Sequence, residues 1–247
     1  MTAVRAIVTG HSRGLGAAIA ADLLGRDIAV LGVARSGNPA LAGRFPGLFR
    51  ETALDLADHA ALLAWLMDGE LARFLSGSER ALLVSNAGLL APVAPAGRQD
   101  GPAIAAAVAV NVAAPMILAN AFVTATTDCT DRRLLHVSSG AARSAYAGWS
   151  VYGATKAALD HHARAIAAEC LPGLHIASVA PGVIDTGMQA QIRATAADDF
   201  PLRERFVALK RDGLLAAPED AARALVAYLL GDDFGRQPVA DLRDLAG

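Results

Sequence analysis

Short apolar runs alternate with segments of helical spacing along the whole chain, and this alternation limits the possible folds more than any other feature. The runs are apolar throughout, which is typical of strands covered on both faces. The expected strands are Val4–Thr9, Ile28–Val33, Leu48–Leu54, Ala81–Ser85, Leu134–Ser138, Leu174–Ala180 and Pro238–Leu242. The expected helices are Leu15–Leu24, Ala57–Leu75, Pro102–Thr124, Tyr152–Cys170 and Ala217–Leu230. This order predicts an α/β fold, a doubly wound parallel sheet of about seven strands with helices on both faces.

No linker, repeat or low-complexity tract divides the 247 residues, so we expect a single domain over residues 1–247. The interval Ile184–Arg211 lies between the last long strand and the last helix, and it is more polar than the framework. Ligands bind at the carboxyl ends of the strands in open α/β sheets. We therefore expect residues 184–211 to form a helical flap over that edge.

Composition excludes several classes of function. The formal net charge is -2, so no basic excess points to nucleic acid or an anionic membrane surface. Cys129 and Cys170 are too few for a disulfide framework or a zinc site of their own, and no metal is expected. The most apolar stretch, Ala103–Thr126, is rich in alanine and contains two asparagines and a proline. It is expected to be a buried helix rather than a membrane span, and the protein is expected to be cytoplasmic.

A glycine-rich turn, Thr9–Gly16, joins the first strand to the first helix. Gly10 permits a tight turn, Gly14 lets the backbone approach a pyrophosphate, and Gly16 lets the helix pack closely on the strand. The alternative is an ordinary tight turn, but the strand before it and the helix after it favour a dinucleotide site. The residues expected to contact the coenzyme here are Gly10, Ser12, Arg13, Gly14, Leu15 and Gly16.

The spacing Gly-x3-Gly-x-Gly after Thr9 resembles that of the short-chain dehydrogenase/reductase family, and further motifs extend the resemblance over the whole chain. Ser85–Gly88 resembles the family's Asn-Asn-Ala-Gly, with serine in place of the first asparagine. Asp55 follows the third strand, as does the family's adenine-contacting aspartate, and Pro181–Thr186 resembles the segment that holds the nicotinamide. The resemblance implies a Rossmann-like domain with further coenzyme contacts at Asp55, Asn86, Ala87, Gly88, Tyr152, Lys156, Pro181, Gly182, Val183 and Thr186.

Tyr152 and Lys156 are the candidate catalytic pair, since four residues on a helix place two side chains on one face, about 5–6 Å apart at Cβ. A cation about 5 Å away favours tyrosinate by about 3 kcal/mol at an effective dielectric of about 20, roughly two pKa units. Lys156 is thus expected to lower the pKa of Tyr152 toward neutrality, making it a working acid/base. Ser139 can hydrogen-bond a substrate carbonyl, and the resemblance implies that Asn111 holds a water linking Lys156 to solvent. A buried core tyrosine is the alternative for Tyr152.

The end of the second strand bears on the choice of coenzyme. NAD enzymes usually place an acidic residue there for the ribose 2′-hydroxyl, but this chain has Ala34-Arg35-Ser36. Arg35 and Arg13 of the glycine turn can converge on a 2′-phosphate through charge-assisted hydrogen bonds. The expected coenzyme is therefore NADP(H), with two solvated surface arginines as the alternative.

Two helices are candidates for a subunit interface. Pro102–Thr124 is apolar nearly all round, and Gly153–Cys170 offers many small alanines for close approach. A helix without a polar stripe is covered on both sides. We expect a homodimer or homotetramer through residues of about 102–124 and 153–170, an assembly that the family resemblance also implies.

The segments Ser138–Ala142, Pro181–Gln189 and Gln191–Gly213, together with Trp149, resemble the sepiapterin reductase branch, especially its bacterial benzil reductases that form (S)-benzoin. This implies reduction of one carbonyl of an aromatic or heteroaromatic 1,2-dicarbonyl to a hydroxyketone. Substrate contacts are expected at Ser139, Tyr146, Trp149, Tyr152, Met188 and Asp241. The alternative for the apolar side chains is core or lid packing, and for Asp241 an exposed carboxylate. Other carbonyl substrates (a 3-oxoacyl thioester or a hydroxysteroid) and a non-catalytic NADP(H) sensor stay open.

Overall fold

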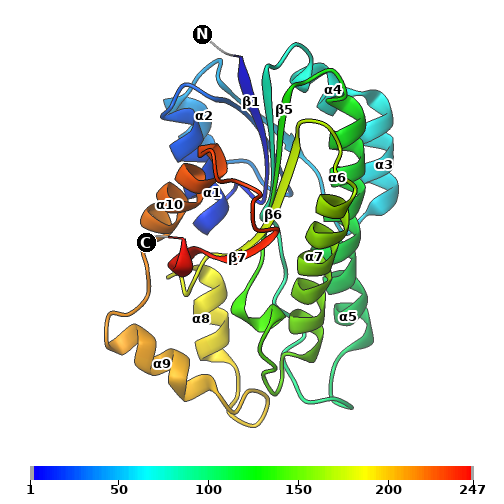
Figure 1. Ribbon diagram of the computed structural model, residues 1–247. Coiled ribbons are helices and arrows are strands. Elements are labelled where there is room, and N and C mark those ends of the chain that lie inside the picture. The colour runs from blue at the N-terminus through cyan, green and yellow to red at the C-terminus, as the bar shows by residue number, and fades with distance from the viewer. Residues whose placement is uncertain (1–2, 246–247) are drawn as a thin grey trace.

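The computed structural model describes residues 3–245, which fold around one seven-stranded sheet (Figure 1). The strands are β1 Val4–Thr9, β2 Ala29–Ala34, β3 Phe49–Ala53, β4 Arg80–Ser85, β5 Asp131–Val137, β6 Leu174–Ala180 and β7 Val239–Asp241. Their order is β3-β2-β1-β4-β5-β6-β7, and every neighbouring pair is parallel. The predicted fold class is confirmed. The strand order reverses between β1 and β4, so their carboxyl ends lie side by side where such folds bind ligands.

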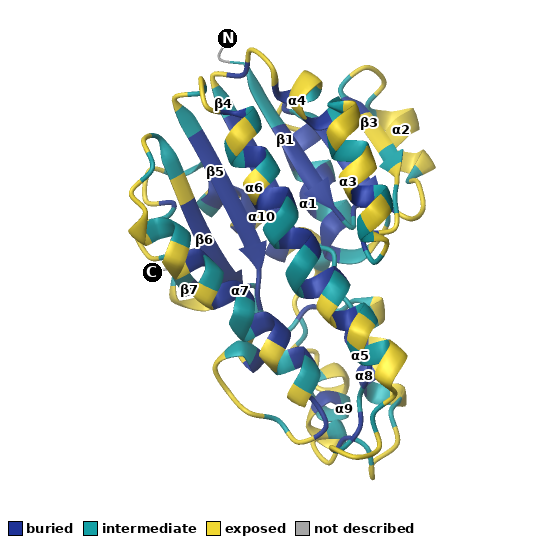
Figure 2. Cartoon of the chain, turned by 90° about the vertical axis from the view of Figure 1, so that its right-hand side faces the viewer, coloured by how far each residue is buried: buried dark blue, intermediate teal, exposed yellow. Residues whose placement is uncertain are grey.

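Helices cover both faces of the sheet. Figure 1 shows α1 and α10 on one face, α3 to α7 on the other, and α8 and α9 beyond the carboxyl ends of the strands. The bounds are α1 Gly14–Leu24, α2 Pro39–Arg44, α3 His59–Asp68, α4 Glu70–Leu75, α5 Gly101–Val108, α6 Ala114–Ala125, α7 Ser150–Ala168, α8 Gly187–Ala194, α9 Arg203–Arg211 and α10 Pro218–Leu230. In Figure 2, β1, β4, β5 and β6 are buried along most of their length.

The alternation of side chains along β1 builds two core layers from one strand. Ala6 and Val8 pack with the layer of α1 and α10, while Ile7 packs with the opposite layer. Successive side chains of a strand point to opposite faces, so an uninterrupted apolar run is required where both faces are covered. A third apolar cluster lies away from these layers, between the sheet edge and the segment carrying α8 and α9.

Several helix boundaries differ from those expected. The single helix predicted over residues 57–75 is wrong, because Gly69 takes a left-handed conformation (φ 79°) that ends α3 and separates it from α4. The helix α7 ends at Ala168, since Cys170 has a positive φ of 52°. The helix α2 was not predicted; the side chain of Asn38 caps it by accepting a hydrogen bond from Leu41 N.

The run predicted as the helix 102–124 is α5 and α6 joined by a π-helical segment, Ala109–Ala113. Such segments insert one residue into a helix and often mark functional positions. Here the segment contains Asn111, whose side chain is buried. Gly101–Ala125 is long and apolar enough to span a membrane by length and composition, and 39% of its most apolar window is buried. In the structure its α6 part packs against β4 and β5, as a layer of the fold.

Candidate active site

The loops after β1 and β4 are joined by the side chains at their base. Thr9 Oγ1 accepts hydrogen bonds from the backbone nitrogens of Asn86 and Ala87, both at 3.0 Å. Asn86 Nδ2 in turn donates to Thr9 O at 3.0 Å. These contacts explain why a threonine precedes the glycine turn and why an asparagine follows β4. They place the two loops together at the reversal of strand order.

The glycine turn leaves no room for side chains at its inner positions. A Cβ on Gly16 would lie 2.2 Å from Gly10 O and 2.3 Å from Asn86 Nδ2, and Gly10 itself has a φ of 72°. At Gly14 (φ 57°) the nearest atom to a Cβ would be Thr186 Cγ2, 3.5 Å away. The inner glycines thus allow α1 to pack on β1, while Gly14 faces the segment after β6. A backbone cradle at the start of a helix is suited to a pyrophosphate.

A second contact network ties the glycine turn to the loop after β2. His11 Nε2 lies 3.0 Å from Glu51 Oε2, and Asn38 N donates to the same oxygen at 2.8 Å. Gly32 makes room for this histidine, since a Cβ there would lie 2.5 Å from the ring. Sequence reasoning missed this network, although a glycine inside a buried strand signals a close approach. Arg13 and Arg35 are both exposed on the segments that it joins.

Lys156, Asn111 and Gly88 converge beside the carboxyl end of β5. Lys156 Nζ donates to Val137 O at 2.8 Å, and a Cβ on Gly88 would lie 3.5 Å from Nζ and 3.4 Å from Asn111 Oδ1. The absence of a side chain at residue 88 therefore keeps the approach to the ammonium open. Asn111 Oδ1 accepts from Leu89 N at 2.7 Å, and its amide nitrogen donates to Leu89 O at 2.8 Å. The asparagine thus fixes the loop after β4, and its predicted water bridge stays a prediction.

Tyr152 is buried on the same face of α7 as Lys156, whose Nζ lies 5.9 Å from the ring centroid. Burial raises the pKa of Tyr152, and a hydrogen bond with Ser139 only partly opposes this. The expectation of a Tyr152 pKa near neutrality is therefore wrong, because the cost of burying a charged tyrosinate outweighs the effect of the Lys156 ammonium, which donates to Val137 O. Burial also lowers the pKa of Lys156 to about 8, against the charge of Asp160. At neutral pH the tyrosine is protonated and can donate.

An aromatic cluster lies on the other side of Tyr152. The Trp149 ring stacks on Phe200 with centroids 4.6 Å apart, and Phe206 lies 5.4 Å from it. Met188 Sδ of α8 is 3.9 Å from Tyr152 Oη, so the flap reaches the candidate acid, and the substrate contact expected of Met188 stays a prediction. Trp149 is 6% exposed, which favours the alternative that its ring supports the flap. Sequence reasoning missed Phe200 and Phe206, whose signal is two phenylalanines in an interval more polar than the framework.

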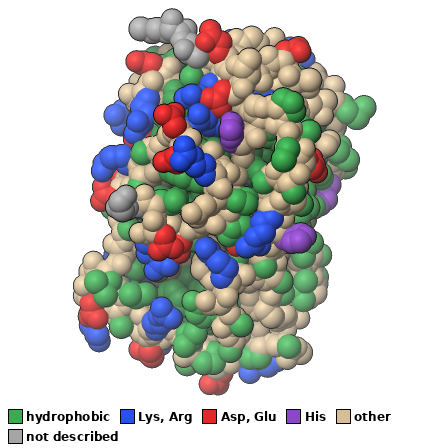
Figure 3. Space-filling model, in the orientation of Figure 1, with side chains coloured by type: hydrophobic (Ala, Val, Ile, Leu, Met, Phe, Trp, Pro, Cys, Tyr) green, Lys and Arg blue, Asp and Glu red, His purple; other side chains and the backbone are tan. Residues whose placement is uncertain are grey.

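The expected flap interval contains α8 and α9, and charged contacts attach it to the framework. Asp199 pairs with Arg98 after β4, and Lys210 of α9 pairs with Asp185 at the start of the interval, directly after β6. On the face shown in Figure 3, hydrophobic side chains gather in a hollow beside these helices, and basic side chains lie around it. The hollow lies at the carboxyl edge of the sheet, on the flap side of the molecule.

The remaining predicted residues lie at this edge in different settings. Both carboxylate oxygens of Asp241 accept from the Arg243 guanidinium, at 2.8 and 2.7 Å, which lowers the pKa of Asp241. Asp55 is exposed after β3, where its carboxylate accepts from Ala57 N at 2.9 Å. Further residues partly buried at the edge are Tyr146, Pro181, Gly182, Val183 and Thr186. Within residues 3–245, no three His, Cys, Asp or Glu side chains are grouped to hold a metal.

Residues 4–197 match the sequence profile of the family described as short chain dehydrogenase. The chain belongs to this family, and it is an oxidoreductase that acts on CH–OH or C=O groups. Benzil reductase ((S)-benzoin forming) from Bacillus cereus is 35% identical over 92% of this chain and 94% of its own length. Sepiapterin reductase from Meriones unguiculatus is 31% identical over 96% of this chain and 95% of its own length. The branch predicted from the sequence is confirmed.

Two solved structures extend the comparison. A short-chain dehydrogenase/reductase from Burkholderia vietnamiensis is 50% identical, with a TM-score of 0.72 and 98% of each chain covered. An NAD(P)-dependent gluconate 5-dehydrogenase from Beutenbergia cavernae, described as putative and with bound NADP at low occupancy, is 26% identical. Its TM-score is 0.82, over 100% of this chain and 98% of the other. The family uses a nicotinamide coenzyme, NAD(H) or NADP(H).

Proposed function

We propose that this protein is an NADPH-dependent reductase that acts on one carbonyl of an aromatic or heteroaromatic 1,2-dicarbonyl and forms a hydroxyketone. The observation that carries the proposal is the position of the buried Tyr152 between Lys156 and the aromatic cluster of the flap. The similarity to a benzil reductase at 35% identity supports the same substrate class. The apolar hollow on the flap side of the molecule suits a flat, uncharged ring system.

The glycine turn and the loops after β4 and β6 would hold the coenzyme. Gly14 leaves space for a pyrophosphate at the start of α1, and Gly88 leaves space beside the Lys156 ammonium. From that position Lys156 would donate to the ribose hydroxyls. Pro181–Thr186, at the end of β6, would lie along the nicotinamide. The bound coenzyme supplies a hydride, that is, two electrons and one proton.

The proton for the reaction comes from Tyr152. Ser139 and Tyr152 would hold one carbonyl oxygen by hydrogen bonds, and the hydroxyl of Tyr152 would donate its proton as negative charge develops on that oxygen. Lys156 stabilises the tyrosinate that remains until a solvent proton replaces the one lost. A second carbonyl beside the first withdraws electrons and makes hydride addition easier. Reduction should therefore stop at the hydroxyketone, which has lost this activation.

Two exposed arginines support NADP(H) as the coenzyme. Arg13 lies in the glycine turn and Arg35 follows β2, and the network of His11, Glu51 and Asn38 ties these segments together. Two guanidinium groups are well suited to a 2′-phosphate. A related structure holds NADP, which agrees with this choice.

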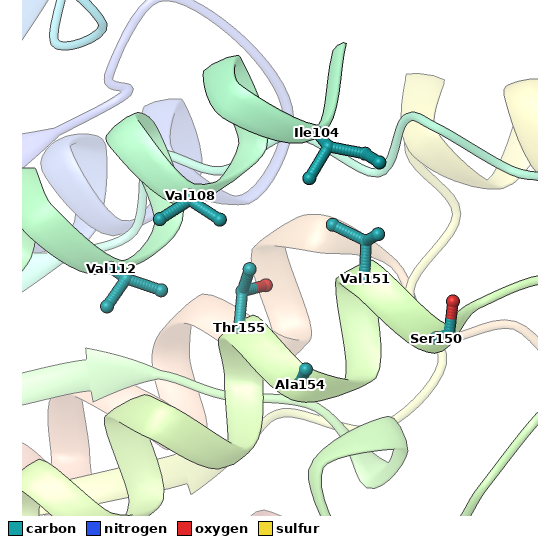
Figure 4. A pocket seen from close by; sticks show the side chains of 7 residues that line it. All are labelled: Ile104, Val108, Val112, Ser150, Val151, Ala154 and Thr155. Carbon is teal, nitrogen blue, oxygen red and sulfur yellow. The ribbon is translucent and has the colours of Figure 1, made fainter. Parts of the chain in front are cut away.

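A second copy of the chain would cover the outer face of α5 and α7. Figure 4 shows Ile104 and Val108 of α5, with Val112 of the π-helical segment that follows, opposite Val151 and Thr155 of α7 across an apolar groove. Val108 is 45% exposed, although it is a large apolar residue. The exposure of this apolar face supports the proposed homodimer or homotetramer. We place this oligomer in the cytoplasm. Light scattering at micromolar concentration should report an oligomer, and a monomer would contradict this assembly.

The substrate class is tested by a product assay with excess NADPH. Benzil should be turned over faster than an isolated ketone, and the main product should be the hydroxyketone benzoin. A diol as the main product, or faster turnover of an acetoacetyl thioester, would contradict the proposed substrate class and indicate that the enzyme reduces another kind of carbonyl compound. Binding of NADPH without any turnover would instead indicate a sensor.

A further inference from the structure

Asp160 carries a buried carboxylate one helical turn after Lys156 on α7. The residue is 2% exposed, and its Oδ1 accepts hydrogen bonds from Ser138 Oγ at 2.6 Å and from Ser178 Oγ at 2.7 Å. Ser138 directly follows β5, and Ser178 lies on β6. The carboxylate thus joins α7 to two neighbouring strands just beneath the candidate catalytic residues.

Two serine hydroxyls do not account for a charge at this position. An asparagine would accept from both hydroxyls, without the cost of burying a charge. Asp160 Oδ2 has no hydrogen-bond partner within residues 3–245, and Arg143 Nε lies 3.9 Å from it. A buried carboxylate that is half satisfied by neutral groups keeps its charge only where a cation offsets the cost of burial. The side chain of Arg143 is 35% exposed, so solvent screens its charge, whereas the other nearby cation, Lys156, is 4% exposed.

The other titratable groups around Lys156 do not offer a negative charge. His136 of β5 and His162 of α7 lie against each other, with Nε2 and Nδ1 3.1 Å apart. Burial lowers the pKa of both, that of His136 to about 3, so the pair is neutral at neutral pH. Burial raises the pKa of Tyr152, which is also neutral. The charge of Asp160 is what opposes the effect of burial on the pKa of Lys156.

We propose that Asp160 is a positioning residue that keeps the buried Lys156 ammonium charged. The inference rests on the proposed role of Lys156 beside Tyr152, and it adds the group that stabilises the positive charge of this lysine. Loss of the carboxylate destabilises the ammonium, so Lys156 gives up its proton at lower pH. Tyrosinate then forms without a cation beside it, and the ribose loses a charged donor.

The chain allows a direct test, because Lys156 and Lys210 are its two lysines. Protein labelled with 13C at the lysine Cε should give one NMR signal for each lysine, and Lys210→Arg assigns them. In the protein without coenzyme, the Lys156 signal should titrate with a midpoint at a pH of about 8. Asp160→Asn should lower this midpoint by about 1–2 pH units. The control Ser178→Ala removes one hydrogen bond but keeps the charge, and should leave the midpoint in place.

The same variants are then compared in the pH dependence of kcat/KM for carbonyl reduction with NADPH. The alkaline limb should move to lower pH in Asp160→Asn, by the shift seen in the NMR titration, and should stay in place in Ser178→Ala. A purely structural role would lower melting temperature and rate in both variants without moving the limb. An unchanged NMR midpoint in folded Asp160→Asn would overturn the inference.

Two further outcomes keep the test decisive. If Asp160→Asn does not fold, the combined change Asp160→Leu, Ser138→Ala and Ser178→Ala removes the charge without leaving buried hydroxyls unpaired, and the same fall in midpoint is required. If Tyr152→Phe keeps its turnover, the proposed catalytic pair fails, while the lysine titration still decides the role of Asp160. An unmoved midpoint together with an inactive Tyr152→Phe rejects the inference about Asp160 alone.

Discussion

The two sides of the candidate site are held together by different means. On the coenzyme side, backbone atoms pack directly against one another, since a Cβ on Gly16 would lie 2.2 Å from Gly10 O. The Thr9 hydroxyl also joins two loops by accepting hydrogen bonds from main-chain nitrogens. On the flap side, rings pack against rings, with Trp149 stacked on Phe200 at 4.6 Å. One side depends on the lack of side chains, and the other depends on their bulk.

This difference explains why one side is easy to recognise and the other is free to vary. A close approach of two backbones accepts only glycine, so the requirement appears in the chain as a short motif with fixed spacing. A cluster of apolar side chains tolerates exchanges that conserve volume. Relatives can therefore share a coenzyme site while their flaps accept different carbonyl compounds.

The largest effect is expected at Tyr152, where the two sides meet. Tyr152→Phe keeps the ring in its cluster but removes the proton donor, and kcat should fall about 10²–10⁴-fold. NADPH binding, measured by fluorescence, should persist. Lys156→Ala should lower the rate and also raise the KM for the coenzyme, because the ribose contact is lost. A Phe variant that keeps more than a tenth of the wild-type kcat would show that another group is the acid.

The next largest effect is expected from the two arginines on the coenzyme side, whose charge can be removed without changing the backbone of the glycine turn. Replacing both Arg13 and Arg35 by alanine should erode the preference for NADPH over NADH by a few kcal/mol, at about 1.5–3 kcal/mol per charged hydrogen bond. The measurement is kcat/KM with each coenzyme, and NADH values should change little. Equal use of NADH by the wild type would contradict the choice of NADP(H).

Gly16→Ala tests the backbone contact itself. The added methyl group has no space, so we expect a loss of about 1–3 kcal/mol in stability or coenzyme affinity, measured by thermal unfolding and fluorescence titration. Gly43→Ala is the matched control, because nothing lies within 4 Å of a Cβ there. It should be neutral or slightly stabilising, as alanine favours helix α2. If both substitutions behave alike, the close approach does not hold the turn together.

The smallest effect is expected on the flap side. Trp149→Ala should raise the KM for benzil about tenfold, because roughly one or two apolar contacts with the substrate are lost. The KM for butanedione should rise less. Butanedione has no aromatic ring to lie against Trp149. The two substrates therefore distinguish a role of Trp149 in binding the substrate ring from a role in packing the protein. Equal changes in both KM values would mean that Trp149 only supports Phe200 and Phe206.

Local patterns determined much of what could be predicted. The apolar runs specified the parallel sheet, and the turn Thr9–Gly16 and the spacing of Tyr152 and Lys156 specified the candidate coenzyme and catalytic residues. These signals are readable because each is a contact between residues that are neighbours in the chain, or a glycine that a turn requires. Where such a signal was overlooked, as at Gly69, the structure still shows a local cause.

Only the tertiary structure decided the electrostatics of the site and the shape of its substrate side. Spacing alone predicted a pKa of Tyr152 near neutrality, but burial raises this pKa above its ordinary value. The contacts of Asp160 with Ser138 and Ser178, and the stacking of Phe200 on Trp149, join residues with no common motif. Desolvation and side-chain packing depend on everything that surrounds a group in space, and the order of residues along the chain does not record those surroundings.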